Sequence, residues 1–377
     1  MDYKNLFARF KQPVSGRYIT NEHIKPLLPD DAFVAGWSVE DREIFAVKTG
    51  SGPNRILIWS QMHGNESTTT KALLDFLAFL YSDDDRASYF LEQYTFFIIP
   101  ILNPDGAAAY TRHNAADVDL NRDFQNLSQR ESTLLHEVFK DFRPHLCFNM
   151  HDQRTIYGAG TTGKPATLSF LAPSFNENRE WNDVRLHSAR LIVAIEKSLR
   201  SELPGMIARY DDGFNPNCVG DSFQAAGVPT VLFEAGHYLD DYQRETTRTF
   251  IACALLTALS AHLENLEELN LFNYLDIPQN EVNFYDVVYK NVTFNYDGIK
   301  IISNFAAQFT ERLRDGKIEF EAFVTAINLQ ENIYGHRLYD AKGEEFSSAF
   351  GKVPVVGSCA DFRLGSIEFK NGLPLES

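Results

Sequence analysis

The chain has 377 residues, of which 44% are hydrophobic and 23% are charged, and its formal net charge is −16 at pH 7. This length favours two domains, and the composition is typical of a folded globular protein. An acidic chain without a basic stripe is a poor partner for a phosphate backbone, so we expect no nucleic-acid role.

The N-terminal residues 1–11 contain no apolar segment of the kind found in a secretory signal. No apolar stretch approaches the roughly 18 residues that a membrane-spanning helix needs. Four scattered cysteines show no metal or redox spacing: Cys147, Cys218, Cys253 and Cys359. We therefore expect no membrane partner and a cytoplasmic protein, with a processed secreted form left open.

Strand-like and helix-like patterns alternate through the first 265 residues, after a Pro-containing lead-in over residues 1–40. Short apolar runs predict strands at 43–47, 56–59, 96–101, 145–150 and 229–233. Apolar residues at helical spacing predict helices at 67–81, 131–142, 183–202 and 240–266. This alternation predicts an α/β sandwich around a mixed or parallel sheet.

Polar clusters follow four of the predicted strands. His63-Gly64-Asn65-Glu66 follows the second strand, and Asn103-Pro104-Asp105-Gly106 follows the third. His151 and Glu234 follow the fourth and fifth. Because ligands of open α/β sheets bind at the carboxyl ends of strands, this joint placement predicts a functional site there.

His63, Glu66 and His151 are the candidate metal ligands. An open zinc site of the metallopeptidase kind needs two His and one Glu, with water in the fourth position. Each residue alone has a plainer interpretation, because a histidine after a strand is usually structural and a strand-end glutamate is usually solvated.

Arg112, Asn121 and Arg122 lie between these clusters. Arginine offers a planar fork for a carboxylate, so these residues could hold a substrate's acidic end. The alternative is a surface ion-pair network with the aspartates in residues 117–123.

Together these motifs resemble the zinc carboxypeptidase family over roughly residues 40–265. The resemblance implies a three-layer α/β/α sandwich with a mixed central sheet. It implies that His63, Glu66 and His151 bind Zn²⁺ and that Glu234 is the general base.

The same resemblance assigns the substrate-binding groups. It implies that Arg112 polarises the scissile carbonyl and that Asn121 and Arg122 hold the terminal carboxylate. The family also has a mobile tyrosine, for which Tyr210 is the nearest candidate.

The interval from Glu66 to His151 is shorter than in digestive relatives, which predicts trimmed loops around the site. Trimmed loops of this kind resemble those of compact murein-peptide amidases and of the succinylglutamate desuccinylase/aspartoacylase branch. That branch also shares the His-Gly-Asn-Glu and Asp-Leu-Asn-Arg motifs. The Asn-Pro-Asp-Gly turn and the Arg-x-Asn before Asp-Leu-Asn-Arg favour a peptidase, so the leading hypothesis is a zinc metallocarboxypeptidase acting on peptides. The alternatives are a zinc amidohydrolase of N-acyl amino acids or murein peptides, and a zinc-free binding module.

Substrate preference depends on residues 217–221. If Val219 faces the substrate, apolar C-terminal residues are favoured. If Asp221 does, a basic or diaminopimelate-like side chain would pair with it. The plainer alternative is that Asp221 caps a helix starting near Ser222.

Beyond Pro278 the pattern changes to short alternating runs with Asp-Gly turns. We expect a catalytic domain over residues 1–274 and a small β-rich domain of unknown role over residues 275–377. The sequence leaves the oligomeric state open.

Overall fold

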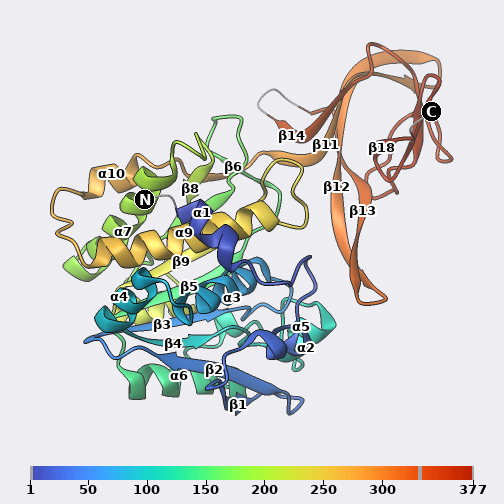
Figure 1. Cartoon of the computed structure of the whole chain (residues 1–377). Helices are drawn as coiled ribbons and strands as arrows, with labels where there is room; N and C mark the ends of the chain where they lie inside the picture. The colour runs from blue at the N-terminus through green and yellow to red at the C-terminus, as the bar shows by residue number, and fades with distance from the viewer. Residues whose placement is uncertain (1–2, 330–332, 376–377) are drawn as a thin grey trace. The chain divides into compact units, whose positions relative to one another are not determined.

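The computed structural model describes residues 3–329 and 333–375 (Figure 1). The chain forms two compact units: unit 1 is Met1–Gln153 with Ala166–Asn280, and unit 2 is Arg154–Pro165 with Glu281–Ser377. Residues 154–165 therefore join unit 2, although they lie within the first 274 residues, which the sequence assigns to one domain.

Unit 1 is built on an eight-stranded sheet of order β1-β2-β4-β3-β5-β9-β7-β8. The central strands β4, β3, β5 and β9 are mutually parallel, whereas β1, β2 and β7 pair antiparallel with a neighbour. The bounds are β1 Phe33–Trp37, β2 Glu43–Thr49, β3 Asn54–Ser60, β4 Tyr94–Ile99, β5 Leu146–Asp152, β7 Leu168–Leu171, β8 Ile207–Arg209 and β9 Thr230–Ala235. Strands buried on both faces read as continuous apolar runs, which is why they were visible in the sequence.

Helices cover both faces of this sheet. The helices on one face include α1 Tyr3–Phe10, α3 Thr68–Leu80, α4 Asp85–Gln93, α7 Asp183–Leu199 and α9 Glu245–His262. Those on the other face include α6 Arg130–Phe142 and α8 Val219–Ala225. Shorter helices are α2 Asn21–Ile24, η1 Lys25–Leu27, α5 Pro104–Ala109, η2 Leu120–Arg122 and α10 Leu271–Leu275. The predicted three-layer α/β/α fold is confirmed (Figure 1).

Three local predictions differ from the structure. The expected lead-in over residues 1–40 contains α1, which buries Leu6 and Phe7 in the main core. The helix expected over 240–266 starts only at Glu245, because Arg244 takes a left-handed backbone conformation at φ 57°. The Asn-Pro-Asp-Gly turn is the start of α5.

The β-rich character of the C-terminal region is confirmed. One four-stranded sheet has the order β13-β12-β11-β14, and another has the order β15-β16-β17-β18. The bounds are β11 Phe284–Tyr296, β12 Ile299–Arg314, β13 Lys317–Ile327, β14 Tyr334–Asp340, β15 Phe346–Ser347, β16 Phe362–Leu364, β17 Ile367–Lys370 and β18 Leu373–Pro374. A separate pair joins β6 Tyr157–Ala159 to β10 Asn280–Val282.

Within residues 3–329 and 333–375, no helix combines the length and the apolar character needed to cross a bilayer.

Candidate metal centre

The loop that carries His63 and Glu66 is fixed by a close approach to α5. A Cβ on Gly64 would lie 1.8 Å from the carbonyl carbon of Gly106, so only glycine fits there. Asn103 caps α5 by accepting the Gly106 N–H at 2.8 Å, and its amide donates to Met62 O at 3.1 Å. The Asn-Pro-Asp-Gly motif therefore positions the ligand loop.

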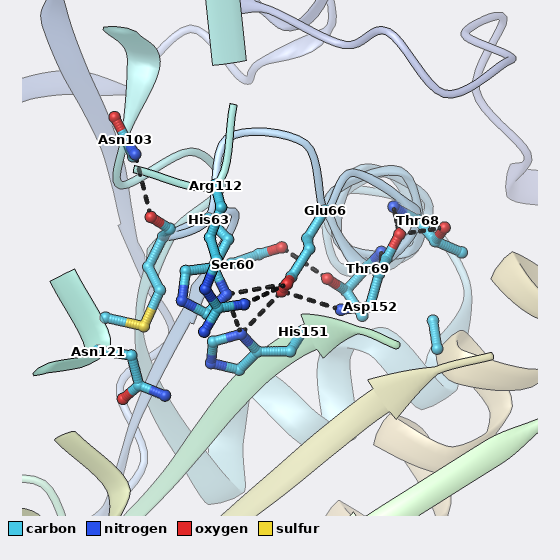
Figure 2. Close-up of polar contacts among 12 residues, drawn as sticks. Ser60, His63, Glu66, Thr68, Thr69, Asn103, Arg112, Asn121, His151 and Asp152 are labelled. Atoms are coloured by element: carbon cyan, nitrogen blue, oxygen red, sulfur yellow. Dashed lines mark hydrogen bonds and ion pairs between the residues drawn. The ribbon is translucent and has the colours of Figure 1, made fainter. Parts of the chain in front are cut away.

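His63, Glu66 and His151 offer ligand atoms that all lie within 4.8 Å of one another. His63 Nδ1 is 2.9 Å from Glu66 Oε1, and His151 Nδ1 is 2.9 Å from Glu66 Oε2. The two Nδ1 atoms are 3.1 Å apart. Figure 2 shows the three side chains converging from the loop after β3 and from the end of β5.

This donor set fits a zinc ion. Two nitrogen ligands at the usual zinc distance in a tetrahedral site lie about 3.4 Å apart, close to the separation of the two Nδ1 atoms. Both histidines are 2% exposed, so two basic nitrogens and a carboxylate share a desolvated space. His151 Nε2 is buried and has no hydrogen-bond partner among the described residues.

Asp119 and Glu66 hold His63 in one orientation. Asp119 Oδ1 lies 3.0 Å from His63 Nε2, so Nε2 carries the proton and Nδ1 presents its lone pair. Burial opposes a charge on Glu66, yet the neighbouring imidazoles of His63 and His151 hold its pKa well below the usual value. Glu66 is therefore ionised, as a metal ligand must be.

Asp152, which was not among the candidate residues, connects β5 to α3. Its carboxylate accepts the Thr68 N–H at 3.0 Å and the Thr68 hydroxyl at 2.6 Å (Figure 2). Its own N–H donates to Glu66 Oε2 at 3.2 Å. These bonds fix the end of β5 against the segment that follows Glu66.

Glu234 lies on β9 directly opposite His151 on β5. Both residues are next-to-last in their strands, whereas the sequence predicted that they lie just beyond the strand ends. Glu234 is buried, and its Oε2 has no hydrogen-bond partner among the described residues. Burial, followed by the charges of Glu66 and Asp152, raises its pKa well above the usual value.

Arg112 reaches the ligand group and is half-exposed. Its Nε donates to Asp119 Oδ2 at 3.0 Å, and its Nη1 lies 3.3 Å from Glu66 Oε1. In Figure 2 it lies beside His63. The ion pair between Arg112 and Asp119, which was the alternative to a substrate-binding role, is present. It also directs the guanidinium toward the candidate metal ligand Glu66.

Asn121 and Arg122 are tied to the start of α8. Asn121 Oδ1 accepts the Val219 N–H at 3.1 Å. Arg122 Nη1 donates to Asn121 O at 2.7 Å and lies 3.0 Å from Cys218 Sγ. Arg122 forms no ion pair in the part of the chain that the structure describes.

Tyr210 lies just beyond an edge strand of the sheet. It follows the edge strand β8, and its N–H donates to Phe170 O at 2.8 Å. The strand β7 separates β8 from β9, which carries Glu234. The assignment of Tyr210 stays a prediction.

The prediction that Asp221 caps a helix starting near Ser222 is wrong. The helix α8 already begins at Val219, with Cys218 at its N-cap, so Asp221 lies inside the first turn. Burial raises the pKa of Asp221 to about 7. Val219 is fully buried in the hydrophobic cluster between α8 and the sheet.

Comparison with known proteins supports the resemblance seen in the motifs. Residues 31–146 match the model of the zinc carboxypeptidase family, and this segment contains His63, Glu66, Arg112, Asn121 and Arg122. The chain is 31% identical over 114 residues to "Probable carboxypeptidase 2" of Arthroderma benhamiae, covering 30% of this chain and 21% of that protein. It is 31% identical over 100 residues to "Carboxypeptidase 2" of Trichophyton rubrum, covering 26% of this chain and 19% of that protein. The chain thus matches only about a fifth of the length of these relatives.

Solved structures show the same fold at low sequence identity. A metallo-carboxypeptidase from Pseudomonas aeruginosa, in complex with (2-guanidinoethylmercapto)succinic acid, has a TM-score of 0.52 and 18% identity, covering 66% of this chain and 70% of that one. A metallo-carboxypeptidase from Burkholderia cenocepacia has a TM-score of 0.51 and 16% identity, covering 65% of this chain and 69% of that one.

Proposed function

We propose that this chain, whose residues 31–146 carry the zinc carboxypeptidase pattern, is a zinc-dependent metallopeptidase that hydrolyses the C-terminal amide bond of a peptide. The observation that carries the proposal is the convergence of His63, Glu66 and His151 within 4.8 Å beside a buried Glu234. Metal-assisted amide hydrolysis requires a set of metal ligands and, next to it, a carboxylate that does not bind the metal.

His63, Glu66 and His151 would hold the ion. Bound zinc supplies two effects: it lowers the pKa of a water molecule toward 7 and polarises the scissile carbonyl. Asp119 keeps the ligand nitrogen of His63 free of a proton through its bond to Nε2.

Glu234 is the proposed general base. It takes the proton of the attacking water and passes it to the leaving amine. Its raised pKa comes from burial and from the charge of Glu66. Ligation of Glu66 to a cation removes part of that charge effect, which brings Glu234 closer to a working base near neutral pH.

Arg112, Asn121 and Arg122 would bind the substrate. Arg112 already directs Nη1 toward the ligand group, where negative charge develops on the carbonyl oxygen in the transition state. Arg122 has no carboxylate partner among the described residues and can hold the free carboxylate of a chain end. Such a clamp fixes the attack geometry and limits cleavage to the terminal bond.

The test uses the full chain loaded with zinc and a pool of short peptides. We expect about one zinc per chain and the release of single C-terminal amino acids. Glu234→Gln should lower kcat about 10²–10⁴-fold while zinc content stays unchanged. The exposed Glu264→Gln serves as the matched control and should keep full activity.

Two results would oppose the proposal. Unchanged turnover in Glu234→Gln removes the general base, and absence of zinc binding removes the ligand assignment. Hydrolysis of N-acyl amino acids or murein peptides with ordinary peptides inert would select the amidohydrolase alternative.

A further inference from the structure

We infer that Arg244 is a positioning residue, which fixes the distance between the proposed general base Glu234 and the metal ligand His151. The inference rests on the proposed function, because it names a residue that acts through the base and the ligand of that same site. Arg244 lies at the N-cap of α9 and is 1% exposed.

The Arg244 side chain joins the carboxyl ends of the two strands that carry these groups. The strands β5 and β9 are parallel, and His151 lies opposite Glu234. Directly after Glu234, the carbonyl oxygen of Ala235 accepts from Arg244 Nη1. Shortly after His151, the carbonyl oxygen of Gln153 accepts from Arg244 Nη2 at 2.5 Å. One planar guanidinium therefore binds both strand ends through its fork of donors.

The two strands have few other bonds at this point. The Gln153 N–H donates to Ala235 O at 2.9 Å, at the end of the pairing between β5 and β9. The next residue of β9 turns to another strand, since the Gly236 N–H donates to Thr167 O at 2.8 Å. Ala235 and Gln153 are buried, and buried carbonyl oxygens require a donor, which Arg244 supplies to each.

The backbone of Arg244 is held in a conformation that an arginine rarely adopts. Its φ is 57°, in the left-handed region. Such a residue persists only where neighbouring contacts fix it, and these contacts come from Asp241. The Arg244 N–H donates to Asp241 O at 3.0 Å. The Asp241 carboxylate accepts the N–H groups of Glu245 and Thr246 at 2.9 Å and 2.7 Å.

The segment around Arg244 is also fixed to α3, the helix that follows the ligand loop. Lys71 of α3 is fully buried. Its Nζ donates to Gln243 O at 2.8 Å and to Glu245 Oε1 at 2.6 Å. The guanidinium is thus held from the same helix into which the loop of His63 and Glu66 leads.

Asp152 provides the negative charge that a buried guanidinium needs. Arg244 Nη1 lies 3.9 Å from Asp152 Oδ2, and Arg17 Nη2 lies 3.8 Å from the same oxygen. The Asp152 N–H donates to the metal ligand Glu66 (Figure 2). Arg244 therefore contacts the two strand ends and the residue that bonds Glu66.

The distance between base and metal matters for the reaction. A general base must come within about 2.6–3.2 Å of the group whose proton it takes, and a misplacement of about 1 Å can cost roughly 10²-fold in rate. Without Arg244 the two strand ends lose their shared donor, so Glu234 can move relative to His151. The proposed substrate-binding residues lie on other segments, so this movement should affect turnover more than binding.

The test compares Arg244→Met and Arg244→Lys with the wild type, using the zinc-loaded full chain and one peptide substrate. We expect kcat per bound zinc to fall about 10–100-fold in Arg244→Met, while KM stays close to the wild-type value. Arg244→Lys keeps the charge and one group of donors, so it should restore part of the lost kcat. It also preserves the test if the methionine variant folds poorly.

Arg248→Met is the matched control. Arg248 lies on the same helix, is fully buried and also donates to backbone carbonyls, those of Gln12 and Val14. Its loss should lower the stability but leave kcat per bound zinc as in the wild type. A merely structural role of Arg244 would give the same result in Arg244→Met.

Hydrogen exchange of the zinc-free protein gives a readout that needs no turnover. The Gln153 amide should exchange about tenfold faster in Arg244→Met, relative to the Phe148 amide in the middle of β5, since one weakened hydrogen bond has an effect of this size. In Arg248→Met this ratio should be that of the wild type.

Three results would overturn the inference: a wild-type kcat in Arg244→Met, an equal loss of kcat in Arg244→Met and Arg248→Met, or a raised KM at unchanged kcat. Each of them leaves the proposed function standing. If the wild type releases no residue from any peptide, the proposed function fails, and hydrogen exchange decides the rest. An unchanged Gln153 ratio would then remove the strand-end role of Arg244, whereas a raised ratio would support it.

Discussion

Unit 1 and unit 2 fill their interiors in different ways. Unit 1 buries charged side chains in pairs, such as Arg248 with Asp75, next to a large apolar core. Unit 2 fills its core with aromatic rings, and Tyr289 stacks on Phe305 with 4.4 Å between ring centroids. The ion pair between Arg314 and Glu321 of unit 2 is exposed to solvent. Buried ion pairs such as Arg248 with Asp75 thus occur in the unit that carries the candidate metal centre, which is where perturbed ionisable groups are expected.

The two units can be followed separately in solution. All three tryptophans, Trp37, Trp59 and Trp181, lie in unit 1. Tryptophan fluorescence therefore reports the unfolding of unit 1, whereas hydrogen exchange can be read for each unit.

The largest expected effect is the loss of a buried ion pair in unit 1. Arg248 is fully buried and donates to both oxygens of Asp75, at 2.7 Å and 2.5 Å. Arg248→Met leaves the Asp75 carboxylate without its partner, so we expect the free energy of unfolding to fall by about 3–5 kcal/mol. Urea denaturation followed by tryptophan fluorescence measures this change.

The matched control removes both charges. Arg248→Met combined with Asp75→Asn should recover part of the lost stability, because no uncompensated charge remains. A loss below about 1 kcal/mol in the single variant would mean that this pair behaves like a surface pair.

Acid should weaken unit 1 through a half-buried histidine pair. His262 Nδ1 lies 2.8 Å from His187 Nε2, and burial, helped by His187, lowers the pKa of His262 to about 4. An unfolded chain keeps the ordinary pKa near 6.5, so it binds the extra proton between these values. The stability contribution is present above pH 6.5 and is lost as pH falls toward 4, by about 3 kcal/mol.

Comparison with a variant isolates this histidine from the carboxylates that titrate in the same range. His262→Gln should flatten the pH dependence of the tryptophan-reported stability between pH 6.5 and 4. His113→Gln changes a histidine with a half-exposed side chain and should leave the slope as in wild type. An equal slope in wild type and His262→Gln would contradict the assignment.

Zinc should stabilise unit 1 and leave unit 2 unchanged. At a free zinc concentration a hundred times the Kd, binding adds about 2.7 kcal/mol to the free energy of unfolding. His63→Ala should remove this effect, and His136→Ala, outside the ligand group, should keep it. Equal zinc stabilisation of His63→Ala and wild type would place the ion elsewhere.

Much of the fold and of the metal centre could be predicted from the sequence, because the signals lie within short stretches of the chain. Buried parallel strands give apolar runs, and the ligands follow those runs within a few residues, as His63 and Glu66 do after β3. The family pattern then supplied roles for residues such as Arg112, which the structure brings to Glu66.

What the sequence could not supply are partners distant along the chain. Asp152 caps the start of α3 from 84 residues away, and nothing in its neighbourhood predicts this. The start of α8 was missed because Cys218 is not a typical N-cap residue.

The smallest effect is expected at an exposed ion pair of unit 2, in contrast to the buried pair of Arg248 and Asp75 in unit 1. Arg314 on β12 lies opposite Lys317, and Glu321 on β13 lies opposite Thr310. The side chains of the Arg314–Glu321 ion pair are 58% and 29% exposed. Water and salt screen such a pair, so Arg314→Ala should cost less than about 1 kcal/mol, measured by hydrogen exchange of the β12 and β13 amides. A double-mutant cycle with Glu321→Ala isolates the pair from the loss of the arginine's own packing. A coupling energy of several kcal/mol would mean that exposure does not separate the ion pairs of the two units, and the contrast with Arg248 would then require another cause.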